Sequence, residues 1–402
     1  MDLSYGEAYE EFRKEVQAFL AENWPPAGEA AELSRKAQVD RFRDRAVDVG
    51  YLARSIPRKY GGSEQVPDAL KAAVIAEEFR KLRAPMDPVG LGVGLLVPTL
   101  LEKGTDWQKE KFIRPTMRGH IRWCQGYSEP GSGSDLASLQ TKGELVGDEW
   151  LINGQKIWTS GAQTADYCFC LVRTEPEQSK HAGISYLLID MHQPGVEVRP
   201  LRQMTGHSGF NEVFFSDAKT PKDWIVGERG EGWLVSRTTL KHERSGLMNV
   251  GQATGQLPAL VKLAQRSTRD GRPAIEDPEV RQKLAEIEGY MKANEYSLYY
   301  RATRGRKGQD AGRIQLMAKL IRSEITQEVA KLAMELIGDD GLLSGGGELG
   351  MRESPSDNRG WVTSYMGSLG GAIAAGSSNI QRNVIGERGL GLPRDWAAQR
   401  SK

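Results

Sequence analysis

WCQGYSEPGSGSDLASLQTKGELVGDEWLINGQKIWTSG, residues 123–161, is the stretch on which the interpretation of the whole chain depends. It holds a Ser-Glu-Pro turn, a Gly/Ser loop at 131–135, a Gly147-Asp148 turn of the kind that joins two strands, and the run Trp158-Thr159-Ser160. The loop offers backbone N–H groups without side-chain bulk, which suits close approach of a polar ligand. By itself, however, the pattern is more often that of two ordinary strands, because Gly-rich loops are weak motifs.

The composition is that of an ordinary globular protein. The chain has 402 residues, enough for two or three domains or for one large multi-layer unit. Its 54 Lys and Arg balance 53 Asp and Glu, so the net charge of +1 gives no support for a nucleic-acid or membrane partner. There is no basic leader and no run of about eighteen apolar residues, so neither a signal peptide nor a spanning helix is expected.

Three cysteines occur, at Cys124, Cys168 and Cys170. The odd count argues against a secreted disulfide framework and favours the cytoplasm. Cys168 and Cys170 are two residues apart on an expected strand, so we expect them to share one face as small core residues. The five histidines are scattered along the chain, and no metal site is expected.

The first part of the chain, residues 1–119, has the periodicity of helices. Apolar residues recur at helical spacing, and Thr105 with Gln108 forms a capping-box pattern that predicts a helix start. The expected helices cover Tyr9–Asn23, Asp40–Val49, Asp68–Arg83 and a last one from Thr105 to about Met117.

The pattern then changes to short β-branched and aromatic runs over residues 120–231, and returns to long helical stretches over 232–402. The expected strands cover Trp150–Ile152, Tyr167–Val172, Ile184–Met191, Val196–Leu201 and Val213–Phe215. The expected helices of the last part include Leu260–Gln265, Val280–Thr303, Ile314–Ile337 and Trp361–Ala375, with a Gly/Ser/Pro-rich connection at 344–358. The fold class is therefore α+β, with an N-terminal helical domain, a β-barrel-like middle domain and a C-terminal helical bundle.

This order of domains, with YSEPGSGSD and INGQKIWTSG in the middle and GSSNIQRNVIGERGLGLPR near the end, resembles the acyl-CoA dehydrogenase family over essentially the whole chain. The resemblance implies FAD bound between the β domain and the C-terminal helices. It also implies an acyl-CoA substrate that is oxidised to the 2-enoyl-CoA, with electrons passed to an electron-transferring flavoprotein. The assembly it implies is a homotetramer or a dimer, with a heteromer left open.

The matching motifs assign candidate site residues. The cofactor-binding positions that the resemblance implies are Gln125, Tyr127, Ser128, Trp158, Thr159, Ser160, Arg269, Gly338, Ser377 and Asn379. The substrate-binding positions that it implies are Ser134, Arg244, Ala375 and Gly376.

Two positions depart from the best-known family pattern. Arg266-Ser267-Thr268-Arg269 replaces the usual Arg-Phe-Gly, so Arg269, with Arg266 next, is the candidate for reaching the neighbouring subunit's FAD pyrophosphate. Glu335 stands in the segment that cradles the cofactor, where a carboxylate would repel the pyrophosphate. The local composition is similar to that of the bacterial branch acting on bulky acyl-CoAs such as steroid side chains, some of which work as heteromeric pairs.

The resemblance also implies which residue is the catalytic base. In many family members a Glu directly precedes the glycine of the C-terminal motif, but here Ala375 occupies that position. A second subset carries its Glu on the first long helix of the C-terminal domain, which matches Glu243 in Lys241-His242-Glu243-Arg244. From spacing alone, a helical Glu beside an Arg is usually a solvated surface pair. Arg244 is expected to be structural, and His242, about 100° around the helix, a packing or hydrogen-bonding residue.

Other interpretations stay open. The same fold could serve an acyl-CoA oxidase or a flavin monooxygenase, or the chain could be a non-catalytic partner subunit of a heteromeric dehydrogenase. The sequence does not give the acyl group.

Overall fold

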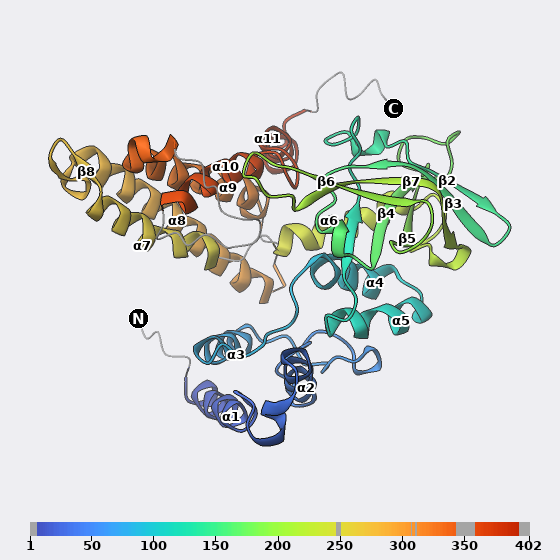
Figure 1. Ribbon diagram of the computed structural model, residues 1–402, viewed down its shortest axis with the longest axis horizontal. Helices are drawn as coiled ribbons and strands as arrows, with labels where there is room; N and C mark the ends of the chain where they lie inside the picture. The colour runs from blue at the N-terminus through green and yellow to red at the C-terminus, as the bar shows by residue number, and fades with distance from the viewer. Residues whose placement is uncertain (1–5, 247–250, 307, 310–311, 343–357, 394–402) are drawn as a thin grey trace. The chain divides into compact units, whose positions relative to one another are not determined.

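The computed structural model describes residues 6–246, 251–306, 308–309, 312–342 and 358–393 (Figure 1). The chain forms two compact units. One comprises Met1–Gly131, Ala137–Arg199 and Asn211–His242, and the other comprises Ser132–Leu136, Pro200–Phe210 and Glu243–Lys402. Within the described residues, no helix is both long and apolar enough to cross a membrane.

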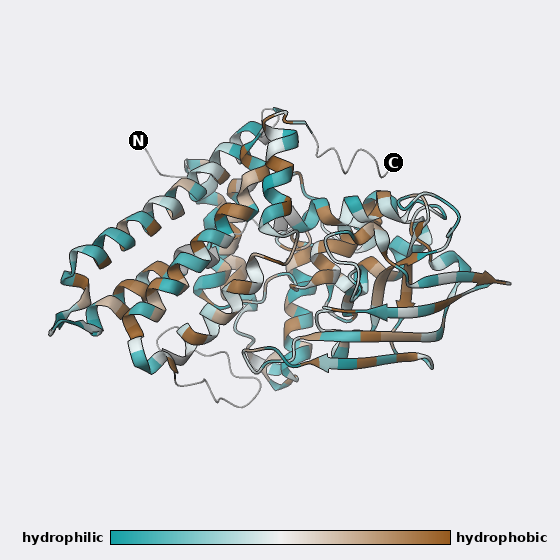
Figure 2. Ribbon diagram, turned by 90° about the horizontal axis from the view of Figure 1, so that it is seen from above, coloured by the Kyte–Doolittle hydropathy of each residue, from teal (hydrophilic) through white to brown (hydrophobic). Residues whose placement is uncertain are grey.

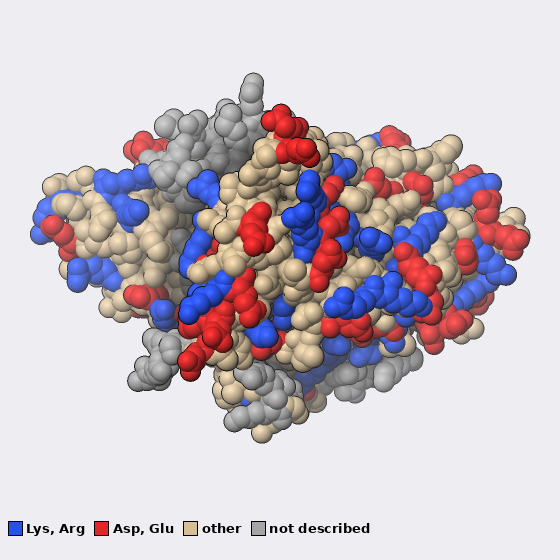
Figure 3. Space-filling view, turned by 90° about the horizontal axis from the view of Figure 1, so that it is seen from below, with Lys and Arg blue, Asp and Glu red and all other residues tan. Residues whose placement is uncertain are grey.

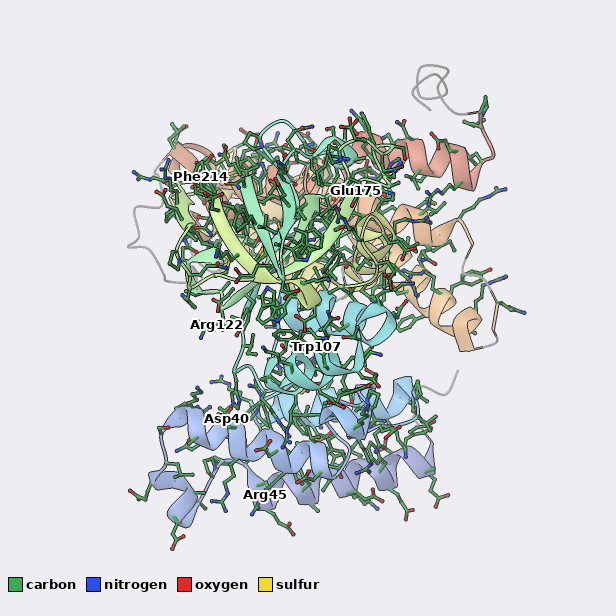
Figure 4. The ribbon with its side chains drawn as sticks, turned by 90° about the vertical axis from the view of Figure 1, so that its right-hand side faces the viewer. Asp40, Arg45, Trp107, Arg122, Glu175 and Phe214 are labelled. Atoms are coloured by element: carbon green, nitrogen blue, oxygen red, sulfur yellow. The ribbon has the colours of Figure 1, made fainter. Side chains whose placement is uncertain are left out.

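The first unit begins with helices, as predicted: α1 (Glu7–Asn23), α2 (Arg35–Asp48), α3 (Ala69–Lys81), α4 (Val97–Lys103) and α5 (Asp106–Met117). The capping box at Thr105 and Gln108 is present and starts α5. α4 and α5 lie between the first three helices and a sheet (Figure 1). In Figure 4, Asp40 and Arg45 mark α2, Trp107 marks α5, and Phe214 marks the sheet.

The sheet has seven strands: β1 (Trp123–Gly126), β2 (Lys142–Val146), β3 (Glu149–Lys156), β4 (Tyr167–Arg173), β5 (Ile184–Asp190), β6 (Val196–Leu201) and β7 (Phe210–Pro221). Their order is β1-β4-β2-β3-β7-β6, with β5 paired to β4. β2 and β3 form the predicted hairpin around Gly147-Asp148. Hydrophobic and hydrophilic residues alternate along much of β3 and β7, where one face is buried, whereas β4 and β5 are buried on both faces (Figure 2).

The sheet core contains the three thiols. Cys124, Cys168 and Cys170 are fully buried, and all belong to one hydrophobic cluster, which confirms the expectation that Cys168 and Cys170 are core residues. Burial raises the pKa of the Cys170 thiol well above its ordinary value, which disfavours the reactive thiolate. A Cβ at position 126 would lie 2.9 Å from the Cys170 sulfur, so the close packing there favours glycine.

An aromatic cluster joins α5 to the sheet. The ring of Phe112 packs edge-on against Trp123 of β1, Tyr167 of β4 and Trp224, with centroid distances of 5.2, 5.6 and 5.3 Å. Such pairs add to the burial of a large apolar area. α5 is thereby fixed against the strands that lead into the candidate site.

The second unit is a helical bundle, as predicted. Its elements are α7 (Gly251–Arg266), the short hairpin β8 (Thr268–Arg269) and β9 (Arg272–Pro273), α8 (Pro278–Arg306), α9 (Ile314–Ile337), α10 (Asn358–Gly371) and α11 (Ser378–Val384). The long helices α7 to α10 run side by side in Figure 1. Trp361 of α10, 1% exposed, lies in their shared core with Val329 and Leu332 of α9.

α6 (Gly232–Gly246) begins in the first unit, and its last residues belong to the second. The Gly/Ser/Pro-rich connection expected at 344–358 lies almost wholly outside the described residues. On the face shown in Figure 3, basic and acidic side chains are intermixed, as expected for a nearly neutral chain.

Candidate functional site

The end of β3 lies beside the Ser-Glu-Pro turn. The backbone N–H of Ile157 donates to the carbonyl oxygen of Ser128 over 2.9 Å. Tyr127 is buried, while Gln125 and Ser128 are partly exposed. The first unit therefore brings the two predicted motifs, Gln125 to Ser128 and Trp158 to Ser160, to one place.

A buried ion pair supports this arrangement. Lys156 and Glu129 have side-chain exposures of 0% and 8%, and their Nζ and Oε1 atoms are 2.8 Å apart. Lys156 also donates to the Tyr127 carbonyl oxygen over 3.2 Å, and Glu129 accepts the N–H groups of Gln140 and Thr141. Burial by itself would raise the pKa of Glu129, but Lys156 and these hydrogen bonds outweigh it and lower the pKa below its ordinary value.

Trp158 has two unusual properties. The residue is 58% exposed, and its φ of 60° lies in the left-handed region that residues other than glycine rarely adopt. Large aromatic side chains are usually covered in a folded protein. An exposed indole in a strained backbone conformation indicates a surface shaped for a ligand.

Two buried polar atoms lie next to Trp158. Among the described residues, the Thr159 hydroxyl and the Asn211 side-chain oxygen have no hydrogen-bond partner, although both residues are 0% exposed. Buried polar groups without a partner are uncommon and call for an unseen water or ligand. The exposed indole is the feature that fits the flavin that the sequence implies, because a flavin ring needs an apolar surface to pack against, whereas the two buried atoms are closed off from the surface.

The second unit carries the C-terminal motif in a tight turn between α10 and α11. Ala375 and Gly376 have φ values of 53° and 85°, two left-handed residues in succession. The Gln381 amide donates to the Ala375 carbonyl oxygen over 3.4 Å, and a Cβ at position 376 would lie 2.7 Å from the same amide. Ser377 caps α11 by accepting the N–H of Ile380. The turn thus explains why glycine is required at position 376.

Other expected residues of the second unit are exposed. Ser134 is exposed and lies in the segment Ser132–Leu136, which belongs to the second unit. Asn379 on α11 accepts from Arg382 over 3.5 Å, and Gly338 ends α9 with a φ of 54°. Their predicted roles toward a cofactor or substrate stay predictions.

The positions that depart from the family pattern form ion pairs. Arg269 donates to Glu279 over 3.0 Å, and Glu335 is 2.8 Å from the Lys283 ammonium. Lys283 therefore compensates the carboxylate that was expected to repel a pyrophosphate. Both pairs are exposed, so each contributes little to the free energy of unfolding.

The candidate base Glu243 is partly buried near the end of α6, while the side chain of Arg244 lies outside the described residues. His242, one residue earlier, has its Nε2 atom 2.6 Å from the Glu102 carboxylate on α4, and the Thr99 and Thr239 hydroxyls of the same two helices are 3.0 Å apart. The expected hydrogen-bonding role of His242 agrees with this contact. α4 thus fixes the part of α6 that precedes Glu243.

Sequence reasoning missed Glu129, Lys156 and Asn211. The first two lie inside the opening stretch, but a Lys and a Glu 27 residues apart give no local sign that they are buried together. The described residues contain no group of His, Cys, Asp or Glu arranged to hold a metal ion.

Comparisons with known proteins cover the whole chain. Family models described as acyl-CoA dehydrogenase N-terminal, middle and C-terminal domains match residues 6–120, 124–218 and 230–390. The acyl-CoA dehydrogenase IpdE1 of Mycobacterium tuberculosis is 39% identical over 96% of this chain and 98% of its own length.

Solved structures are similar over the same extent. A chain of the ChsE4-ChsE5 complex from Mycobacterium tuberculosis is 30% identical, with a TM-score of 0.74 over 98% of this chain and 100% of its own. A chain of the Tcur3481-Tcur3483 steroid ACAD is 27% identical, with a TM-score of 0.74 over 98% of this chain and 100% of its own.

Proposed function

The chain belongs to the acyl-CoA dehydrogenase family, and from that premise we propose that it oxidises a bulky acyl-CoA thioester to the 2-enoyl-CoA with FAD. Electrons then pass to an electron-transferring flavoprotein. The observation that supports FAD most directly is the exposed indole of Trp158 on a strained backbone, a large apolar surface of the kind that a flavin ring packs against.

In this proposal the chain supplies the base. Glu243 removes the α-proton of the acyl group, since Ala375 has no carboxylate. When bound, FAD supplies the acceptor for the hydride that leaves the β-carbon. The products are therefore the enoyl thioester, a protonated Glu243 and a reduced flavin, which balances atoms and electrons. Exclusion of water by the substrate raises the pKa of a carboxylate, which makes it a stronger base.

The turn at Ala375 and Gly376 supplies hydrogen-bond donors, which the reaction needs in addition to a base. Proton removal next to a thioester needs hydrogen bonds to the developing enolate oxygen, and preoriented donors are typically the largest catalytic term. No hydrogen bond between described residues uses the backbone N–H of Ala375 or Gly376. These N–H groups are the proposed donors to the thioester oxygen.

Substitution of Glu243 tests the base. Glu243→Gln keeps the shape of the side chain and removes its basicity. The variant should bind FAD normally, but the rate at which an acyl-CoA bleaches its flavin should fall by at least about 1,000-fold. Anaerobic stopped-flow absorbance measures the bleaching rate. Glu328→Gln, an exposed glutamate paired with Lys331 on α9, is the control and should bleach like the wild type. Unchanged bleaching in Glu243→Gln would remove Glu243 from the mechanism.

The substrate class rests on the relatives. One similar structure is titled a steroid ACAD, and this supports an acyl group larger than a straight fatty chain. The same bleaching assay with a ring-bearing acyl-CoA and with a straight-chain acyl-CoA of equal length tests the assignment. Faster bleaching by the straight chain would overturn it.

A second candidate function is partnership in a heteromeric dehydrogenase. One similar structure is titled the ChsE4-ChsE5 complex, and the other, the steroid ACAD, is titled with two protein names, Tcur3481-Tcur3483. In this alternative the chain completes a site with a different subunit and does not hold FAD alone.

A further inference from the structure

The backbone at Trp158 is held in a conformation that costs free energy. A non-glycine residue in the left-handed region carries a cost on the order of 1–3 kcal/mol and persists only where its surroundings fix it. The ladder between β3 and β7 has its last regular pair at Lys156 and Val213. Something beyond the regular strand pairing must therefore hold Trp158.

Asn211 provides that restraint. The N–H of Thr159 donates to the Asn211 carbonyl oxygen over 3.0 Å, and the Asn211 side-chain amide donates to the Thr159 carbonyl oxygen over 2.9 Å. One fully buried residue thus fixes both backbone polar groups of the residue that follows Trp158. The amide nitrogen is also 3.3 Å from the Gln163 side-chain oxygen.

The chemistry of these contacts explains why an asparagine is required. Both partners of the side-chain nitrogen are oxygen acceptors, so only a donor can serve there. An aspartate of the same shape would place an oxygen against the Thr159 carbonyl oxygen in a buried site; the Gln163 amide could turn to donate, but the carbonyl could not. The side-chain oxygen of Asn211 has no partner among the described residues, so the restraint acts through the NH₂ group.

We propose that Asn211 is a positioning residue for the cofactor: it clamps Thr159 and so holds the Trp158 indole in the orientation that packs against the flavin ring. This inference rests on the proposed function, because it requires a bound flavin. Asn211 itself does no chemistry on the substrate.

The same strand pair offers a matched control. Asn153 on β3 and Asp217 on β7 are also joined by two hydrogen bonds: the Asn153 amide donates to the Asp217 carboxylate and the Asp217 N–H donates to the Asn153 side-chain oxygen, each over 2.9 Å. Asp217 is also left-handed, with a φ of 54°. This second pair is exposed and lies away from Trp158, so its loss should affect stability and not flavin binding.

The experiment is a double-mutant cycle on FAD affinity. Asn211→Ala should weaken FAD binding about tenfold, which corresponds to about 1.4 kcal/mol of binding free energy. It should also change the shape of the visible flavin spectrum. Asn211→Asp should do the same or more, and Asn153→Ala should leave both unchanged. In a Trp158→Ala background the further effect of Asn211→Ala should fall to less than about twofold, since the residue acts through the indole.

Several outcomes would overturn the inference. An FAD affinity and spectrum in Asn211→Ala equal to those of Asn153→Ala would show a merely structural role, as would a full tenfold effect in the Trp158→Ala background. If Asn211→Ala does not fold, Asn211→Ser takes its place, because its shorter side chain no longer reaches the Thr159 carbonyl oxygen; an FAD affinity and spectrum equal to those of the wild type would then reject the clamp. A wild-type protein that binds no FAD overturns the proposed function as well, whereas a loaded and bleachable wild type with an unaffected Asn211→Ala overturns only this inference.

Discussion

Lys156 is a charge placed in the core of the sheet, and its effect on stability can be predicted. Lys156→Met removes the ammonium and leaves the Glu129 carboxylate buried and unpaired, which should cost about 3–5 kcal/mol in the free energy of unfolding. Urea unfolding followed by circular dichroism measures it. Lys142→Met is the control, because its pair with Glu144 on β2 is exposed and should change the free energy by less than about 0.5 kcal/mol. Equal effects of the two substitutions would show that the buried pair has no special role.

Individual candidate site residues differ in how far the sequence could point to them. Trp158 and Glu243 could be named because motifs in the family's order carry them. Asn211 could not, because its partner Thr159 is 52 residues away and the bond depends on where the β3–β7 ladder stops. In the sequence Lys156 has no feature that distinguishes it from other strand lysines; its burial becomes visible only in the fold, where the Ser-Glu-Pro turn covers it. Contacts between distant residues therefore account for what sequence reasoning missed.

At the scale of elements, helices were predicted better than strands. The expected helix Ile314–Ile337 is α9 to the residue, because its apolar periodicity is uninterrupted. The Gly147-Asp148 turn implied a strand before it, but no bounds were predicted for β2, since Lys142–Val146 mixes charged residues with only two large apolar ones. The helix expected to reach Ala375 ends at Gly371, where paired glycines favour a turn, and left-handed residues follow before α11.

The packing of α1 on α3 gives a prediction about pH. Glu78 of α3 has a side chain 4% exposed, with Arg13 of α1 and Lys81 each 2.6 Å away. Burial alone would raise the pKa of Glu78, but hydrogen bonds from Lys81, Gln17 and Arg13 outweigh it and lower the pKa from 4.5 to about 2. A carboxylate with a lowered folded-state pKa stabilises the fold above its unfolded pKa and loses that contribution as the pH falls toward the folded value.

The stability of the wild type should therefore fall by up to about 3 kcal/mol through Glu78 between about pH 5 and pH 2. Glu78→Gln should be less stable at neutral pH and show a flatter profile in this window. Urea midpoints at a series of pH values measure the difference. Glu77→Gln is the control, since its side chain is 36% exposed and it contacts the same Arg13. A Glu78→Gln profile parallel to the wild type would contradict the argument.

At the scale of the whole molecule, the fold class follows from the order of helical, β and helical segments, and the three family-model matches confirm it. The division into two compact units was not predicted. Short segments such as Pro200–Phe210 leave the β part of the chain and cluster with the helical unit. Hydrophobic periodicity reports which face of an element is buried but not which element covers it, so this exchange of segments has no local signal.

Removal of the cofactor is the prediction that separates an independent dehydrogenase from a partner subunit. A ligand that binds only the folded chain stabilises it by RT ln(1 + [L]/Kd), about 2.7 kcal/mol at a hundredfold excess over Kd. The chain purified alone should be yellow with about one FAD per chain, lose a few degrees of melting temperature when stripped, and regain them when FAD is added back. Trp158→Ala should show a smaller FAD-dependent shift, and Asn153→Ala should keep the full shift. A chain that folds alone without flavin and shows no FAD-dependent shift would instead support the heteromeric role, because a subunit that does not hold FAD by itself gains no stability from it.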